Sequence, residues 1–232
     1  MTSLAVRSLA EEQMDAAHLS PETYATVIRD LAKVNRLTLS ARPTLSFIRR
    51  AVRDRPFRLL DVGFGHGDML RAIARWAARQ GLACELVGID LNPRSEPAAR
   101  AATPADLPIE YRTGDYARLG GESWDLIVSS LVAHHMSRTE LTAFLRFMDA
   151  HARMGWLVND LHRHRLAYWG FPLLATVMRW HPMVKADGTL SIARSFRPEE
   201  WPPLLREAGI APGAGARVYR AFPFRLCVEA IR

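Results

Sequence analysis

Short apolar runs alternate with amphipathic stretches along most of the chain, and this alternation predicts strands separated by helices. Runs with the length of buried strands occur at 58–62, 85–90, 109–116, 124–130 and 154–160. Residues from Met69 to about Arg79 have helical periodicity, and the last residues, 217–222 and 225–231, predict a hairpin that turns at Pro223. Alternating strand–helix units of this kind are typical of an open parallel sheet with helices on both faces.

Two helices are expected ahead of the first strand. Ser20-Pro21-Glu22 combines an N-cap residue, a proline at the first helical position and an acid in the first turn. A second helix follows Pro43 and reaches Val52, and a short helix is expected near residues 9–14. We interpret residues 1–54 as an N-terminal helical cap over a bound ligand, or alternatively as a cover for one face of the sheet.

The stretch 161–194 is longer and more aromatic than a plain connection between a strand and the next element. Gly170 and Pro172 interrupt its apolar residues, so one straight helix is not expected. An insertion of this composition can form a lid lined with apolar side chains. Ordinary core packing or a contact between two copies of the chain would explain the same pattern.

Composition limits the class of protein. At 232 residues, with 49% hydrophobic and 24% charged residues, the chain suits one soluble globular domain with an added cap, expected in the cytoplasm as a monomer or homodimer. No apolar run reaches the 18 or so residues of a membrane span, and acids near residue 12 argue against a signal peptide. The two cysteines lack metal-type spacing, so neither a disulfide framework nor a metal site is expected.

The net charge of +7 comes almost entirely from dispersed arginines, without the clustered basic residues and interleaved aromatics of a nucleic-acid footprint. Nucleic acid is therefore not expected as a partner. A basic face could still bring the protein to anionic membrane surfaces, where a lipophilic substrate would reside. Peripheral contact with a membrane is thus the most that the charge predicts.

The clearest ligand-binding pattern in the chain is the segment Leu59-Leu60-Asp61-Val62-Gly63-Phe64-Gly65-His66-Gly67. It predicts a strand, a turn with glycine at every second position and then a helix, which places a ligand-binding loop at a helix N-terminus. A dinucleotide fingerprint would instead have the spacing G-x-G-x-x-G. Asp90 ends the next strand 23 residues after Gly67, close to the spacing expected for a carboxylate that binds ribose hydroxyls.

The D-x-G-x-G-x-G pattern and the strand layout of residues 55–232 resemble the class I S-adenosylmethionine (SAM)-dependent methyltransferases. The resemblance implies a doubly wound α/β fold with a mostly parallel seven-stranded sheet, its last strand antiparallel, and SAM as cofactor. In that family the acid at the position of Asp115 lies beside the adenine amino group; an Asx turn is the alternative explanation for this residue. The residues that the resemblance assigns to SAM are Asp61, Gly63, Phe64, Gly65, Gly67, Asp90, Leu91, Gly114, Asp115, Tyr116, Ser130 and His134.

The segment 129–135 further resembles the ubiquinone/menaquinone-biosynthesis type of methyltransferase. Residues 14–15, 35–36 and 159–165 are similar to a bacterial subgroup associated with polyketide or phenolic-lipid pathways. The resemblance implies a small aromatic or lipophilic acceptor, phenolic, quinol or resorcinol-like, methylated on oxygen, with carbon methylation of a quinone or polyketide precursor as the alternative. The residues expected to contact this acceptor are Asn35, Arg36, His164 and Trp169.

Removal of a proton from a phenol calls for a base that titrates near neutrality, which favours histidine. His134 and His135 follow the fourth strand, and His162 and His164 follow the fifth at the same edge of the sheet. We expect His135 or His162 to act as the base, with Asp160 orienting it or touching the substrate. An NAD-dependent oxidoreductase is the alternative from another class, but the glycine spacing and the lack of a tyrosine with lysine four residues later argue against it.

Overall fold

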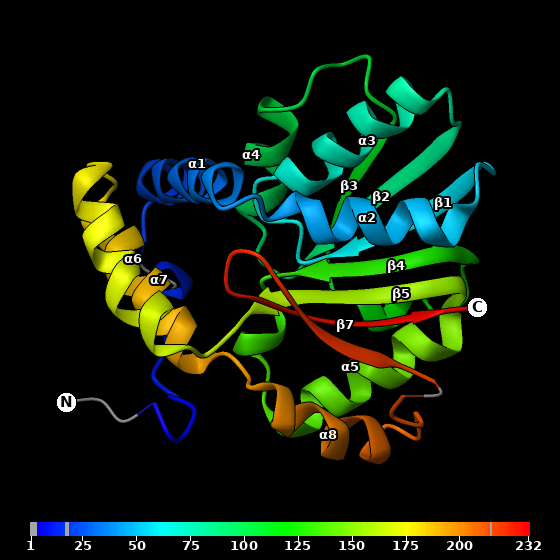
Figure 1. Ribbon diagram of the computed structural model, residues 1–232. Coiled ribbons are helices and arrows are strands. Elements are labelled where there is room, and N and C mark those ends of the chain that lie inside the picture. Colours follow the sequence, from blue (N-terminus) through cyan, green and yellow to red (C-terminus); the bar gives the residue numbers. More distant parts are fainter. Residues whose placement is uncertain (1–3, 17–18, 214) are drawn as a thin grey trace.

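The computed structural model describes residues 4–16, 19–213 and 215–232, except for the side chain of Asp15. Its centre is a seven-stranded sheet in the order β3-β2-β1-β4-β5-β7-β6 (Figure 1). The strands are β1 (Phe57–Val62), β2 (Cys84–Asp90), β3 (Ile109–Thr113), β4 (Trp124–Ser130), β5 (Ala152–Leu161), β6 (Arg217–Ala221) and β7 (Arg225–Ile231). β1 to β5 are mutually parallel, whereas β7 runs antiparallel to both β5 and β6. The doubly wound fold expected from the sequence is confirmed.

The strand order reverses direction between β1 and β4. From β1 the chain proceeds through β2 to β3 on one side, and then returns to place β4 and β5 on the other. The carboxyl ends of β1 and β4 therefore form a topological switch point, where open α/β sheets bind their ligands.

Helices cover both faces of this sheet. They are α1 (Pro21–Leu37), α2 (Ala41–Val52), α3 (Asp68–Gln80), α4 (Ser95–Ala101), α5 (Arg138–His151), α6 (Arg165–Val177), α7 (Pro182–Arg194) and α8 (Trp201–Glu207). Short 3-10 turns add η1 (Gln13–Asp15), η2 (Tyr116–Leu119), η3 (Ala133–His135) and η4 (Pro198–Glu200). The helix expected near residues 9–14 is only the single turn η1, and α4 was not expected because its short sequence shows no apolar periodicity.

The two helices ahead of β1 have different roles. α2 buries Phe47 and Ile48 in the core between the sheet and α3, so it covers one face of the sheet. α1 instead packs its buried Val27 and Val34 against α6 and α7. α2 thus covers one face of the sheet, whereas α1 packs with α6 and α7; the role of residues 1–54 as a cap over a ligand stays a prediction.

The segment 161–194 forms two helices, α6 and α7, that pack against each other and stand with α1 at one end of the sheet (Figure 1). Pro172 lies inside α6 rather than ending it, and the break between the helices falls at 178–181. In the described part of the chain, no helix combines the length and apolarity needed to cross a bilayer.

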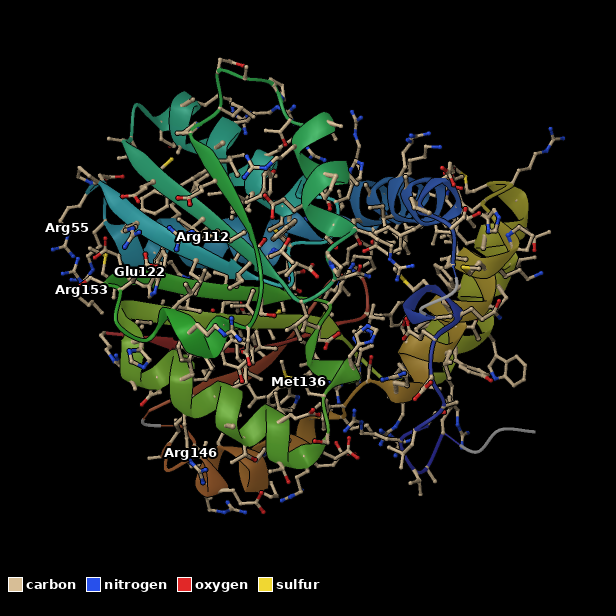
Figure 2. The ribbon with its side chains drawn as sticks, turned by 180° about the vertical axis from the view of Figure 1, so that it is seen from behind. Arg55, Arg112, Glu122, Met136, Arg146 and Arg153 are labelled. Carbon is tan, nitrogen blue, oxygen red and sulfur yellow. The ribbon has the colours of Figure 1, made fainter. Side chains whose placement is uncertain are left out.

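The opposite end of the sheet carries paired charges. Glu122 accepts hydrogen bonds from Arg58 at 2.7 Å and from Arg112 at 2.6 Å, and Arg153 bonds Asp125 at 2.8 Å. Figure 2 shows Arg112, Glu122 and Arg153 together at this end, away from α1, α6 and α7. These charges neutralise one another, so we assign them to the scaffold.

Candidate active site

A cavity of about 810 Å³ lies where the carboxyl ends of the strands meet α1, α6 and α7. Most of its lining side chains are apolar, and they come from both the sheet and the helical cap. The predicted SAM-binding residues that line it are Asp61, Gly63, Phe64, Gly65, Asp90, Leu91, Gly114, Tyr116, Ser130 and His134. Of the other predicted site residues, Asn35 and His135 also line it.

The glycine loop after β1 adopts a backbone that only glycine takes without strain. Gly63, Gly65 and Gly67 have φ angles of +79°, +52° and +75°. Asp90, at the end of β2, supports this loop because its Oδ2 accepts a hydrogen bond from the Gly65 amide at 2.8 Å. Its Oδ1 accepts from the Asn92 amide at 2.9 Å, and carboxylate oxygens keep further lone pairs for ribose hydroxyls.

The three glycines differ in what surrounds them. A Cβ on Gly67 would lie 2.4 Å from the Tyr111 hydroxyl, and one on Gly63 would lie 2.3 Å from Val132, but a Cβ on Gly65 meets nothing within 4 Å. Gly67 is not among the lining residues; it is the N-cap of α3 and packs against Tyr111. The loop therefore presents Gly65 to the ligand.

We expect Gly65→Ala to lower the affinity for SAM by at least tenfold. The fold should lose only about 1 kcal/mol, which is the cost of placing an alanine in the left-handed backbone conformation. Gly67→Ala should change the affinity for SAM less and should lower the melting temperature more, because Tyr111 must move. Calorimetric titration and thermal unfolding of both variants test this; a greater stability loss for Gly65→Ala would contradict the assignment.

Asp61 is buried beneath this loop, and neither carboxylate oxygen has a hydrogen-bond partner among the described residues. Burial, with added repulsion from Asp68 and Asp90, raises the pKa of Asp61 to about 8. An ionised carboxylate without a partner is costly in a protein interior, and a cationic ligand group at this wall would supply the missing charge.

Arg225, at the start of β7, is a second buried charge on the cavity wall. Its Nη2 donates to Thr38 Oγ1 at 3.1 Å, whereas Nε and Nη1 have no partner in the described part of the chain. Burial lowers the pKa of Arg225, against the opposing charges of Asp160 and Asp68. The methionine end of SAM carries an ammonium and a carboxylate group, so Asp61 and Arg225 fit its two charges.

Asp160, at the end of β5, holds His134 through two atoms. Its Oδ2 accepts from the His134 amide at 2.8 Å, and its Oδ1 lies 2.7 Å from His134 Nδ1. Burial would raise the pKa of Asp160, but His134 and the amides of His134 and Leu161 outweigh it and hold that pKa below its usual range. The ionised carboxylate can only accept, so Nδ1 carries a proton and Nε2 of a neutral imidazole is the basic nitrogen. Asp160 was expected to orient His135 or His162 or to touch the substrate; in the structure its hydrogen-bonded imidazole is that of His134.

Glu12, which sequence reasoning missed, approaches the same histidines from the N-terminal segment. It is 4% exposed and lines the cavity, with its carboxylate 3.6 Å from His134 Nε2 and 3.8 Å from His135 Nε2. Ser191 donates to Glu12 Oε1 at 2.8 Å, and the backbone contact of Ser8 with Ala193 at 3.0 Å fixes this segment on α7. No local pattern could reveal Glu12, because its partners lie more than a hundred residues away.

Glu12, His134 and His135 also present three possible metal-ligand atoms within 4.8 Å of one another. Two imidazoles and one carboxylate suit several divalent transition metals. The Arg194 guanidinium, however, lies 4.0 Å from Glu12 Oε1, so a cation at this point would face a positive charge. The cluster is therefore better suited to holding and moving a proton than to a resident metal ion.

Besides Asp160, four predicted catalytic or substrate residues lie outside the cavity lining. The His162 amide donates to the Phe224 carbonyl at 2.9 Å, and its ring turns toward His164 and Arg220; burial first, and then Arg220, lowers its pKa. His164 caps α6 and stacks on Phe224, while Trp169 points to solvent with 64% of its surface exposed. Arg36 borders a separate surface depression beside Trp180. The expected contacts of these residues with the acceptor are not supported.

Two of the predicted SAM-binding residues also have partners within the chain. Asp115 is exposed and outside the lining, and its Oδ1 accepts from the Ala117 amide at 2.9 Å, so it forms the N-cap of η2. The Asx-turn alternative describes this residue. Phe64, which departs from the family's small residues, packs its buried ring on Tyr111 at 4.8 Å and lines the cavity with its remaining surface.

Comparisons with known proteins agree with this geometry. Residues 59–155 match the family model described as a methyltransferase domain. No curated protein sequence matches the chain.

Solved structures with the same fold include magnesium protoporphyrin IX methyltransferase from Synechocystis PCC 6803, at 13% identity and a TM-score of 0.57, covering 95% of this chain and 91% of that one. A SAM-dependent methyltransferase from Aquifex aeolicus has 18% identity and a TM-score of 0.62, with coverage of 92% and 98%. Human N-acetylserotonin methyltransferase has 15% identity and a TM-score of 0.63, covering 92% of this chain and 56% of that one. At such identities the likeness establishes the fold alone.

The family match includes β1, the glycine loop, β2 and β4, which are the elements that build the donor side of the cavity. On this side of the cavity, Asp61 and Arg225 have buried polar atoms without a partner that fit the charged groups of SAM, and the sheet order is that of the methyltransferase fold. Residues 59–155 thus form a methyltransferase domain, and the protein is a SAM-dependent methyltransferase.

Proposed function

We propose that this enzyme transfers the methyl group of SAM to a hydroxyl of a small phenolic, quinol or resorcinol-like acceptor. The observation that carries the proposal is the Asp160–His134 pair, whose basic nitrogen stands on the wall of a largely apolar cavity beside the donor loop. A phenol has a pKa near 10, so a positioned base is useful at neutral pH.

Each part of the cavity has a task in this reaction. When bound, SAM supplies an electrophilic methyl group on a sulfonium, and Asp61, Gly65, Asp90 and Arg225 would hold it. Nε2 of His134 accepts the hydroxyl proton of the acceptor, while Asp160 stabilises the imidazolium that results. The Glu12 carboxylate lies 3.6 Å from the same nitrogen.

The remaining walls favour an apolar, ring-shaped acceptor. α1, α6 and α7 supply a continuous set of aliphatic and aromatic side chains: Ile28, Leu31, Val34, Phe171, Leu174 and Ile192. Such walls exclude water, which strengthens the electrostatic interactions of the histidine pair. Carbon methylation of a quinone or polyketide precursor remains the second candidate, because removal of the same hydroxyl proton also activates the neighbouring ring carbon.

The test is incubation of the purified protein with SAM and alkylated resorcinols, catechols and quinols. We expect one added methyl group by mass spectrometry, and nuclear magnetic resonance then separates oxygen from carbon products. Binding of SAM without methylation of any phenolic acceptor would overturn the acceptor assignment while leaving the cofactor assignment intact.

The fit of Arg225 to the donor carboxylate gives a separate prediction. Arg225→Met keeps the length of the side chain without its charge, and we expect SAM affinity to fall by roughly 10- to 100-fold, the range for a charged hydrogen bond. Decarboxylated SAM should bind the variant and the wild type equally well, because it lacks the group that Arg225 contacts. Calorimetry with both ligands measures this, and an equal loss for both would show that Arg225 supports the fold rather than the ligand.

A further inference from the structure

The outer face of α6 is an apolar stripe on the surface of the protein. Leu166, Trp169, Leu173 and Val177 follow one another at intervals of three, four and four residues, so they share one face of the helix. Each is between 64% and 70% exposed, which is unusual for side chains of this size. In Figure 1, α6 stands at the end of the molecule formed with α7 and α1. We call these four residues the α6 stripe.

The α6 stripe continues into the mouth of the active-site cavity. The large apolar residues that both line the cavity and are strongly exposed border its opening; they are Leu37, Leu39, Leu91, Leu166, Phe222 and Phe224. Leu91 follows β2, and the others come from three separated places, namely the end of α1 with the turn after it, the start of α6 and the turn between β6 and β7. His164 ties two of these places together, because it caps α6 and stacks on Phe224 with the ring centroids 5.3 Å apart. Leu166 belongs to both groups, so the stripe and the mouth form one apolar surface.

Basic residues flank this surface. Residues 161–186 contain Arg165, Arg179, Lys185 and the buried Arg163, which is paired with Glu200, but neither aspartate nor glutamate. Arg165 and Arg179, at the two ends of α6, are exposed and have no ion pair within the described ranges. At the far end of the sheet, in contrast, Arg112 and Arg153 are paired with carboxylates (Figure 2). Arg165 and Arg179 thus place positive charge beside the apolar surface.

We propose that this surface docks on a bilayer containing anionic phospholipids, with the α6 stripe in the interfacial region and the cavity mouth facing the lipid. An amphipathic helix with an apolar face, an interfacial tryptophan and basic ends is the type of element that lies in the plane of a membrane surface. A second copy of this chain fits the surface less well, because the arginines at the helix ends would repel their counterparts. Since the docked mouth opens toward the lipid, a lipophilic acceptor can enter the cavity without crossing water. This last consequence rests on the proposed function, whereas the docking itself does not.

The test is co-sedimentation of the full chain with vesicles, without SAM or acceptor. We expect binding to vesicles of phosphatidylcholine mixed with phosphatidylglycerol, and much weaker binding to phosphatidylcholine alone. Trp169→Ser with Leu173→Ser should weaken binding at least tenfold, and Arg165→Gln with Arg179→Gln should do so by roughly tenfold or more. The matched controls Arg79→Gln, on the exposed end of α3, and Ile231→Ser, at the end of β7, should bind as the wild type does.

Circular dichroism and melting temperature show whether each variant keeps its fold, which is expected because the changed side chains are exposed. Equal binding by the stripe variants and the controls would overturn the proposal. It would also fail if the wild type ignored anionic vesicles while Trp169→Ser with Leu173→Ser converted a dimer into a monomer in sedimentation. If the protein bound vesicles but did not methylate a phenolic acceptor in solution, the proposed function would fail and the docking proposal would stand.

Discussion

Asp61→Asn is expected to make the protein more stable and at the same time to abolish most of its affinity for SAM. The carboxyl group has a pKa of about 8 in the folded protein and near 3.9 in the unfolded chain. Between these pH values the folded state binds a proton that the unfolded state has released, so its stability falls as the pH rises. At pH 7 this loss is of order 2–4 kcal/mol.

Asparagine removes that loss because it is neutral in both states. The gain in unfolding free energy should be absent near pH 4, grow as the pH rises and level off above about pH 8. Denaturant unfolding at pH 4 and at pH 7 measures it, and at pH 7 the melting temperature should rise by roughly 5–10 °C. A gain of the same size at both pH values would point to better packing and would contradict the ionisation argument.

The same carboxyl group links donor binding to pH. A cationic donor group beside Asp61 favours the ionised form, so binding releases a proton and the affinity of the wild type should rise between pH 6 and 7.5. Asp61→Asn should bind SAM roughly 10- to 100-fold more weakly and without this rise. Calorimetry in buffers of different ionisation enthalpy would detect the released proton directly; wild-type and variant titrations with equal pH dependence would refute the linkage.

The donor side of this site was predictable because its information is local. Asp61, Gly63 and Gly65 stand within five residues, and their order along a strand and a turn already determines where their side chains lie. Asp90 ends a strand that pairs in parallel with β1, so the two acids had to meet at one edge of the sheet. The strand, the turn and the glycine spacing were therefore sufficient to predict where these residues lie.

The acceptor side could not be predicted in the same way, because its contacts join distant parts of the chain. Glu12 reaches His134 from the N-terminal segment, which is fixed by hydrogen bonds to α7. Arg225 is an ordinary first residue of a strand in sequence, and only the turn at Thr38 and the cavity wall make it a buried charge. Loop lengths and apolar periodicity do not specify such pairings.

The position of His162 has a similar explanation. The sequence places both His135 and His162 just after strands at the same edge, which made them equivalent candidates for the base. The backbone after β5 stays extended, the His162 amide bonds to the Phe224 carbonyl, and His162 is not among the residues that line the cavity. Which way a side chain points after a strand ends depends on what the following residues pair with, and here the partner is a turn sixty residues later.

The acid–base assignment predicts a fall in kcat of about 10²- to 10⁴-fold for His134→Gln, with SAM affinity unchanged. Asp160→Asn should cause a loss of similar order. The asparagine side chain can donate a hydrogen bond to Nδ1, and the imidazole proton then moves to Nε2, where it blocks the base. His151→Gln is the matched control, because this histidine packs on Phe147 at the end of α5, outside the cavity lining.

A change of acceptor separates a chemical role from a structural one. A nitro-substituted phenol is already ionised at neutral pH, so it does not need a base, and both variants should methylate it at nearly the wild-type rate. Because the geometry of donor and acceptor is the same for both substrates, a histidine that only shapes the cavity would affect them equally. Equal losses of kcat with the ordinary and the nitro-substituted phenol would therefore remove His134 from the chemistry and leave it as part of the wall.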